Sequence, residues 1–232
     1  MPPPPFTAGE FFDVFVRYNR TFGFGAIVLT TLALLLVAAI VQERPARNRI
    51  ATQGLALLWF WSGLGYHVMH FARINRVAWG FGAMFVAQAW WFLRSGQPGS
   101  VSRLQFGPPA GGRGWLGGAI MAYALFGYPL VALKVGHAWP QMPTFGVPCP
   151  VVIFTLGLLL WAEEPFPRRL LVVPLLWAGI GSLATLAFGV YEDAGLVVAA
   201  AIAWGALPGR RGHVPAPHRS KQLHPFLGRP RP

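Results

Sequence analysis

Residues 23–41 read GFGAIVLTTLALLLVAAIV, nineteen residues without a charged side chain. A helix of this length extends about 28 Å, which is close to the thickness of the hydrocarbon core of a bilayer. The whole chain has the same character, because 54% of its 232 residues are hydrophobic and only 11% are charged. About a quarter of the residues are charged in a typical soluble domain. The sequence therefore predicts an all-α integral membrane protein and excludes a separate soluble catalytic domain.

Six further apolar segments follow at short intervals. They are residues 51–70, 77–93, 115–134, 149–162, 169–188 and 193–207. Each has the composition expected of a helix that contacts lipid or the interior of a helical bundle. We therefore expect a polytopic transmembrane bundle of about seven spans.

The N-terminal residues 1–22 differ from these segments. Phe11, Phe15 and Tyr18 recur at the spacing of one helix face, which indicates an amphipathic helix. A helix of this kind is typical of a membrane interface, so we expect it to lie on the bilayer surface. The transmembrane domain then comprises residues 23–207.

The positive charges predict the orientation. If the segment after the first span is cytoplasmic, fourteen of the nineteen Lys and Arg residues lie on that side. Because Lys and Arg collect in cytoplasmic loops, we expect a multi-pass protein of the bacterial cytoplasmic membrane, with its N-terminus outside and its C-terminus in the cytoplasm. The Pro- and Arg-rich residues 208–232 form a basic cytoplasmic tail that would attract anionic lipid. The net charge of +12 therefore indicates membrane topology, and nucleic acid is not an expected partner.

In this topology the unusual polar residues converge on the outer end of the bundle. His67 and His70 share a helix face at i and i+3, and Cys149 is the single cysteine. Imidazole and thiolate are ligands suited to copper(I) or zinc, so these three residues are candidate metal ligands. The alternative is that each histidine hydrogen-bonds a neighbouring loop and that Cys149 packs as a small apolar residue.

Other polar residues at the same end are candidates for substrate binding. They are Tyr66, Asn75, His137, Glu192 and Asp193. The two acidic residues also have a simpler explanation, since carboxylates in a first helical turn stabilise the helix dipole.

The loop of residues 136–150 carries four prolines and leads into an apolar helix too short to cross a bilayer. We expect this loop to dip into the outer leaflet and to place Cys149 in the first turn of a half-length helix. The helix dipole at that position favours a thiolate. Irregular backbone at such depth is typical of a binding site.

Three stretches resemble a bacterial family of multi-span membrane proteins that carries only a domain-of-unknown-function label. They are YHVMHFARIN (66–75), GHAWPQMPTFGVPCPVVIFTLG (136–157), and VPLLWAGIGSLA (173–184) with GVYEDAGL (189–196). The TFGVPCP string around Cys149 is the most specific part. Some members are labelled permeases, so the resemblance implies several spans, and it implies no reaction and no established site residues.

Three functional hypotheses follow. The first is a permease-like protein that binds a small solute or a soft metal ion at its outer face. The second is a non-catalytic accessory subunit or assembly factor of a larger membrane complex, suggested by the many aromatic residues and the basic tail. The third is a membrane enzyme with Cys149 as nucleophile and His137 or His67 as base. Ion-coupled carriers lose support, because no Lys, Asp or Glu occupies the middle of a predicted span.

Overall fold

The computed structural model describes residues 6–100 and 103–207, and the predicted tail at 208–232 lies outside these ranges. In the described residues the regular structure is helical, with two isolated bridges and no strand, so the predicted all-α class is confirmed. The α-helices are Ala8–Thr21 (α1), Gly25–Val41 (α2), Arg47–Trp61 (α3), Ala78–Ser95 (α4), Gly111–Ala122 (α5), Tyr128–Lys134 (α6), Pro148–Leu159 (α7), Val172–Phe188 (α8) and Ala194–Ala206 (α9). Short π- or 3-10-helical segments are Ser62–Val68 (η1), Phe71–Arg73 (η2), Tyr123–Gly127 (η3), Arg168–Leu171 (η4) and Tyr191–Asp193 (η5).

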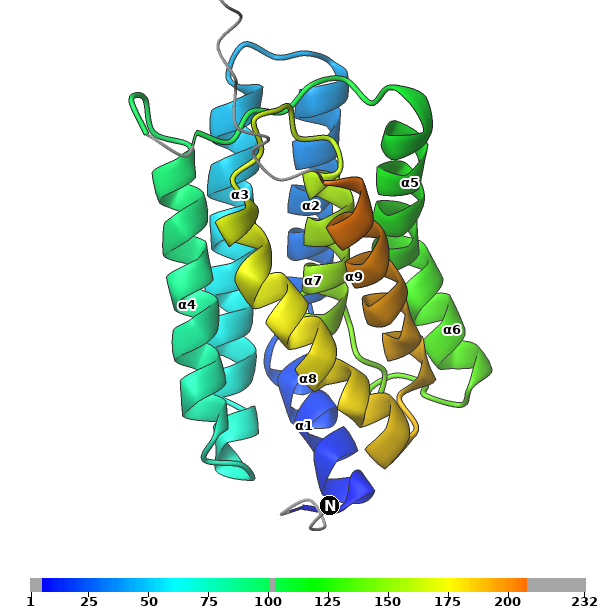
Figure 1. Ribbon diagram of the computed structural model, residues 1–232. Helices are drawn as coiled ribbons and strands as arrows, with labels where there is room; N and C mark the ends of the chain where they lie inside the picture. Colours follow the sequence, from blue (N-terminus) through cyan, green and yellow to red (C-terminus); the bar gives the residue numbers. More distant parts are fainter. Residues whose placement is uncertain (1–5, 101–102, 208–232) are drawn as a thin grey trace, which may run out of the picture.

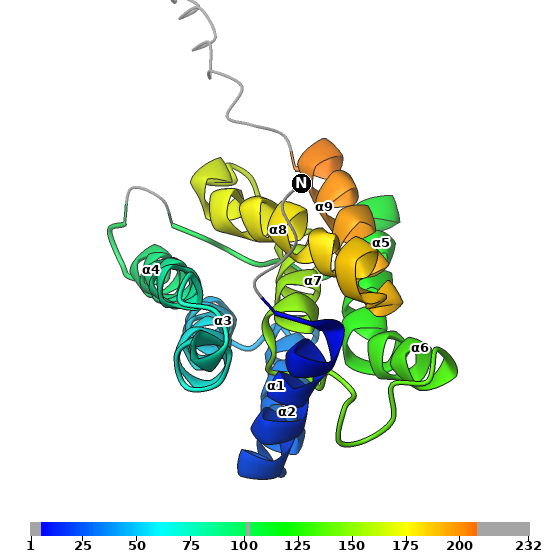
Figure 2. The same ribbon diagram turned by 90° about the horizontal axis from the view of Figure 1, so that it is seen from below.

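The helices from α2 to α9 run side by side in one bundle (Figure 1). The α2–α3, α4–α5 and α7–α8 connections lie at one end, which we call the arginine end because Arg44, Arg47, Arg113 and Arg168 are at or beside them. The opposite end, the α1 end, carries α1, the α6–α7 loop and η5. Seen along the bundle, α7 lies among the other helices (Figure 2). The predicted convergence of polar residues on one end therefore corresponds to the α1 end.

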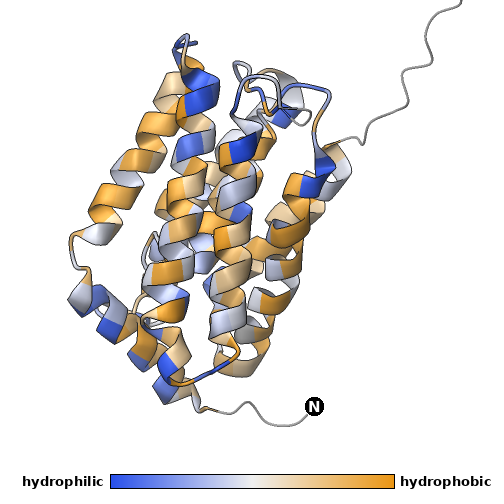
Figure 3. Cartoon of the chain, turned by 90° about the vertical axis from the view of Figure 1, so that its left-hand side faces the viewer, coloured by the Kyte–Doolittle hydropathy of each residue, from blue (hydrophilic) through white to orange (hydrophobic). Residues whose placement is uncertain are grey.

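The expectation of about seven membrane spans is not met. In the described residues, two helical stretches are long and apolar enough to cross a membrane, Gly111–Lys134 and Arg168–Phe188. The number rises to three if α1 and α2, which are bent by 81° at their junction, count as one broken span. The other predicted segments form helices that are too short, such as α7 and α9, or that include several polar residues. Figure 3 shows hydrophobic residues along the helices and hydrophilic residues concentrated towards both ends.

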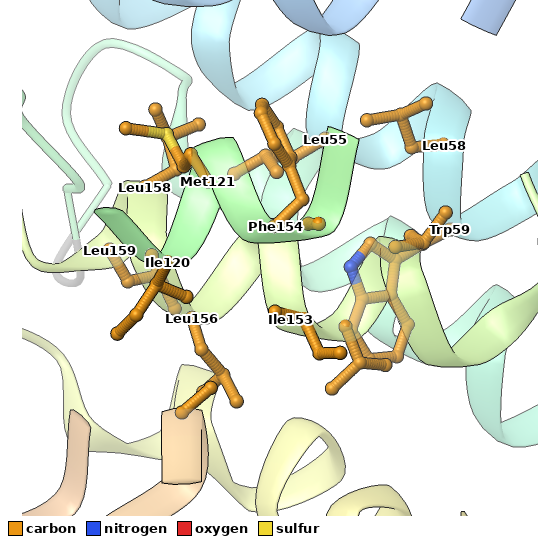
Figure 4. Packing of buried hydrophobic residues seen from close by; sticks show 14 of the residues in the cluster. Leu55, Leu58, Trp59, Ile120, Met121, Ile153, Phe154, Leu156, Leu158 and Leu159 are labelled. Carbon is orange, nitrogen blue, oxygen red and sulfur yellow. The ribbon is translucent and has the colours of Figure 1, made fainter. Parts of the chain in front are cut away.

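Helix α7 forms the centre of the core because it is apolar on every side. Eleven of its twelve residues are buried, and α7 contacts α3, α5, α8 and α9. Figure 4 shows Phe154 and Leu158 of α7 among side chains of α3 and α5, including Leu55 and Met121. Its one central hydroxyl, on Thr155, accepts a hydrogen bond of 2.9 Å from Trp59 Nε1. Burial among other helices therefore explains why this short helix is hydrophobic on every side, without contact with lipid.

Helices α5 and α7 touch through their backbones. A Cβ atom on Gly117 would lie 2.7 Å from the carbonyl oxygen of Gly157, and one on Gly157 would lie 2.9 Å from the carbonyl oxygen of Gly117. Both distances are shorter than real Cβ contacts, so both positions require glycine. Small residues at such a crossing let two helices approach closely.

Helix α1 is amphipathic as predicted, but its apolar face packs against protein. Thr7 and Glu10 form a capping box that begins the helix. Phe11, Phe15 and Tyr18 are buried in a cluster with residues of η1, η2 and α4. This packing explains the amphipathic pattern without a membrane surface, and α1 becomes one wall of the cavity described next.

Candidate functional site

A cavity of about 570 Å³ lies at the α1 end. Helix α8 supplies more of its wall than any other element, and α1, η1, η2, α4, α6, α7, η5 and the neighbouring loops supply the rest. Most of the wall is apolar, and its phenylalanines are Phe6, Phe11, Phe15, Phe71, Phe81 and Phe188. The volume is in the range of small-molecule sites, which are typically apolar with a few polar groups that fix the orientation of the ligand.

The polar groups of the cavity gather around Asp193 in η5. The Asp193 carboxylate accepts a hydrogen bond of 2.5 Å from the Tyr128 hydroxyl and interacts with the thiol of Cys149. Asp193 lies in the turn between α8 and α9, outside the two helices that are long enough to span a membrane. Burial raises the pKa of Asp193 from 3.8 to about 7, while the Tyr128 and Cys149 hydrogen bonds oppose this rise and the neighbouring Glu192 adds to it.

Cys149 is half-buried and lines the cavity, in the first turn of α7 as the sequence predicts. The helix N-terminus favours a thiolate there. However, the surrounding wall is apolar, and the nearest ionisable partner of the thiol is the Asp193 carboxylate. Both the apolar wall and the carboxylate disfavour a negative charge on the sulfur. The indole N–H of Trp177 lies beside the sulfur and has no oxygen or nitrogen acceptor. The site therefore does not activate Cys149 as a nucleophile.

Glu192 and His137 form a second polar pair next to Asp193. The Nδ1 atom of His137 lies 3.0 Å from Oε1 of Glu192, whose side chain is fully buried. The Glu192 backbone carbonyl accepts a hydrogen bond of 2.7 Å from the Tyr123 hydroxyl. The structure thus brings His137, Glu192, Asp193 and Cys149 to one place, and His137 is occupied by the carboxylate rather than by the thiol.

The three predicted metal ligands do not meet. His67 is fully buried among aromatic rings, including Phe85 and Trp177, and neither of its ring nitrogens has a hydrogen-bond partner. His70 points elsewhere, with Nδ1 2.7 Å from the Gly65 carbonyl oxygen and Nε2 3.3 Å from the Thr21 hydroxyl. Across the described part of the chain, no group of three or more His, Cys, Asp or Glu side chains is arranged to hold a metal ion. The spacing of His67 and His70 therefore reflects packing and a backbone contact.

Tyr66 and Asn75, the remaining predicted substrate-binding residues, both line the cavity. The Tyr66 ring stacks on Phe15 of α1 with their centroids 5.8 Å apart. The Asn75 side chain accepts a hydrogen bond of 3.1 Å from the Val77 amide, which shapes the turn before α4. The two residues therefore contribute to the cavity from different elements.

The Pro-rich loop is inserted into the α1 end of the bundle. Asn19 of α1 donates hydrogen bonds of 2.8 Å to the carbonyl oxygens of Pro140 and Met142, and it accepts one from Thr144. Ser62 donates to the Gly146 carbonyl oxygen at 2.7 Å. Gly146 has a φ of +111°, and a Cβ atom there would lie 2.5 Å from Leu29. The loop is thus shaped and buried, and these contacts direct the chain into α7.

The family assignment follows from the extent of a sequence match. Residues 8–211 match the model of DUF6064, a family of unknown function. The chain belongs to this family. The resemblance to a family with a domain-of-unknown-function label is thereby confirmed, whereas membrane location and the TFGVPCP motif stay predictions. No curated protein and no solved structure matches the chain.

Sequence reasoning missed Tyr123, Tyr128 and Trp177. The two tyrosines lie in an apolar stretch without a charged neighbour, and their hydroxyls meet the 192–193 backbone and carboxylate across 65 or more residues. Trp177 follows the same pattern, because it lies inside an apolar helix and becomes a cavity residue only through helix packing. A buried tyrosine hydroxyl or tryptophan N–H usually needs a hydrogen-bond partner. This requirement is the one feature of the sequence that could have indicated these three residues.

Proposed function

We propose that this chain is a permease-like integral membrane protein that binds a small, mostly apolar molecule in the cavity at the α1 end. The cavity carries the proposal, because its volume of about 570 Å³ and its aromatic wall suit such a molecule. The polar cluster around Asp193 would orient the ligand. The structure offers no arrangement for the metal-binding version of this function among the described residues.

The surface supports a membrane environment. Large apolar side chains are exposed on several helices, for example Leu186 at 85%, Trp115 at 84% and Phe24 at 81%. Soluble monomers rarely expose large contiguous apolar patches, and lipid would cover these side chains. The basic residues of the arginine end favour a cytoplasmic position for that end, so the α1 end and its cavity would face outward.

A pair of glycines on α8 provides a matched test of the cavity. A Cβ atom on Gly181 would lie 2.9 Å from Leu196 Cδ1, which must shift to admit it, 3.3 Å from Trp177 Nε1 and 3.5 Å from the Cys149 sulfur. One on Gly179 would meet nothing within 4 Å. Gly181→Leu should therefore fill the inner part of the cavity, and Gly179→Leu should leave the cavity open.

Binding of the neutral hydrocarbon (5,5-dimethylhexyl)benzene would be measured by equilibrium dialysis in zwitterionic nanodiscs, with empty nanodiscs subtracted. The wild type and Gly179→Leu should bind the probe, and Gly181→Leu should lose at least about tenfold in affinity. Thermal unfolding of all three proteins would verify that each is folded. Equal affinities in all three proteins would refute the proposed function.

A further inference from the structure

The charges around the cavity do not balance. Glu192 and Asp193 are adjacent and both buried, and Glu192 has a cationic partner when His137 is protonated. Asp193 has only the neutral Tyr128 hydroxyl and Cys149 thiol. No Lys, Arg or His is among the described residues that line the cavity. A buried carboxylate is normally paired with a cation, so Asp193 lacks the partner that such a group requires.

The wall of the cavity has the complementary property. Phenylalanine, tyrosine and tryptophan rings carry negative potential on their faces and attract cations placed over them. Aromatic residues surround the cavity on α1, η1, η2, α4, α6 and α8. Desolvation increases this attraction to about 2 kcal/mol or more. Among the described residues, the same wall holds no cationic side chain that would balance an anion beside Asp193.

We propose that the ligand of this cavity is an organic cation, an ammonium group on a mostly apolar body, with Asp193 as its counter-ion. The inference rests on the proposed function, because it assumes that the cavity is the binding site. The ammonium would lie at the Asp193 end, and the apolar body would extend along the phenylalanines towards α1 and α8. When Asp193 is ionised, its charge disfavours fatty acids and other lipophilic anions.

Two probes of equal size isolate the charge. They are (4-phenylbutyl)trimethylammonium and (5,5-dimethylhexyl)benzene, in which a quaternary carbon replaces the nitrogen. Their affinities would be compared in zwitterionic nanodiscs at pH 8 for the wild type, Asp193→Asn and Asp13→Asn. The last variant makes the same change of charge on the exposed side of α1 and serves as the control.

The wild type and Asp13→Asn should prefer the ammonium by at least about tenfold. Asp193→Asn should lose this preference, so that it binds the two probes about equally. If the wild type binds the neutral probe as tightly as the ammonium, or if Asp193→Asn keeps the preference, the inference is wrong and the proposed function stands. Binding of neither probe by the wild type would refute both. The comparison of the two probes on the wild type requires no variant, so it tests the inference even if Asp193→Asn does not fold.

Discussion

Gly146 shows how much the α1 end depends on a single backbone position. With φ at +111°, a side chain is strained, and its Cβ atom would also lie 2.5 Å from Leu29 Cδ1 and 2.8 Å from the Tyr18 hydroxyl. We expect Gly146→Ala to destabilise the protein by about 2–4 kcal/mol, from strain and overpacking together. The measurement is thermal or denaturant unfolding in detergent.

Gly136 separates the two causes. Its φ is +94°, but a Cβ atom there would meet nothing within 4 Å. Gly136→Ala should therefore cost only the backbone strain, about 1–2 kcal/mol. A loss in Gly146→Ala no larger than in Gly136→Ala would show that the loop is not inserted as described.

Asp193 should make stability depend on pH. Burial raises its pKa from 3.8 to about 7, so folding favours the protonated form. The stabilisation is fully present below about pH 4 and is lost as the pH rises through 7, with an upper value of about 4 kcal/mol. The titratable groups that interact with this carboxylate are Tyr66, Tyr123, Tyr128, Cys149 and Glu192.

Unfolding of the wild type and Asp193→Asn would be compared from pH 4 to pH 8. The wild type should lose stability relative to Asp193→Asn across this range, because asparagine does not titrate. The difference between the two proteins cancels other titrating groups. A constant difference from pH 4 to pH 8 would contradict the raised pKa.

At the scale of elements, α1 and the Pro-rich loop hold each other through Asn19. Asn19→Ala would leave the carbonyl oxygens of Pro140 and Met142 and the hydroxyl of Thr144 without their partner. We expect a loss of about 2–4 kcal/mol and faster proteolysis in the loop, because unsatisfied buried polar groups are costly. Asp13→Ala, on the exposed side of the same helix, should change neither the unfolding midpoint nor the cleavage rate by a comparable amount. Similar effects in both variants would argue against the anchoring role.

The elements were largely predictable from the sequence, and their environment was not. Apolar runs at helical length indicated the helices, and the prolines of residues 136–150 indicated a shaped loop. The same apolarity does not distinguish a helix that contacts lipid from one enclosed by other helices, so the sequence predicts a half-length span where the structure has the enclosed helix α7. In α1, likewise, the amphipathic pattern fitted both a membrane surface and a protein core.

At the scale of the whole molecule, the two ends of the bundle should face opposite sides of the membrane, and labelling of Cys149 would test the side that the α1 end faces. As the only cysteine, half-buried in the cavity, it should react slowly with a membrane-impermeant cationic thiol reagent applied from the outside. This expectation rests on the proposed cytoplasmic position of the arginine end, which would put the α1 end outside. The measurement is the labelled fraction in vesicles of known orientation.

Gly112 gives the control for the other end. In a Cys149→Ser background, Gly112→Cys places a thiol in open space at the start of α5, near the arginine end. It should react quickly and only from the cytoplasmic side. Labelling of Cys149 only from the cytoplasmic side would reverse the proposed orientation, and inertness of Cys149 until detergent is added would contradict an open cavity.

The candidate site was predictable as a location and only partly as a set of contacts. Topology brought Tyr66, Asn75, Cys149 and Asp193 to one cavity from four separate segments. Spacing along one helix said nothing about which side chain each histidine would meet. His67 is enclosed by rings and His70 bonds a carbonyl group five residues away, and both outcomes depend on tertiary packing.

The glycine contact between α5 and α7 has a consequence for motion. The backbones of the two helices touch at Gly117 and Gly157, and close-packed side chains surround this contact, so α5 and α7 should move as one rigid unit. The opposite wall of the cavity has a different construction, because α1 joins α2 at an 81° bend with Gly23 and Gly25 at the joint. We therefore expect a ligand to enter by a swing of α1 about this joint, and hydrogen exchange should be faster in α1 than in α7.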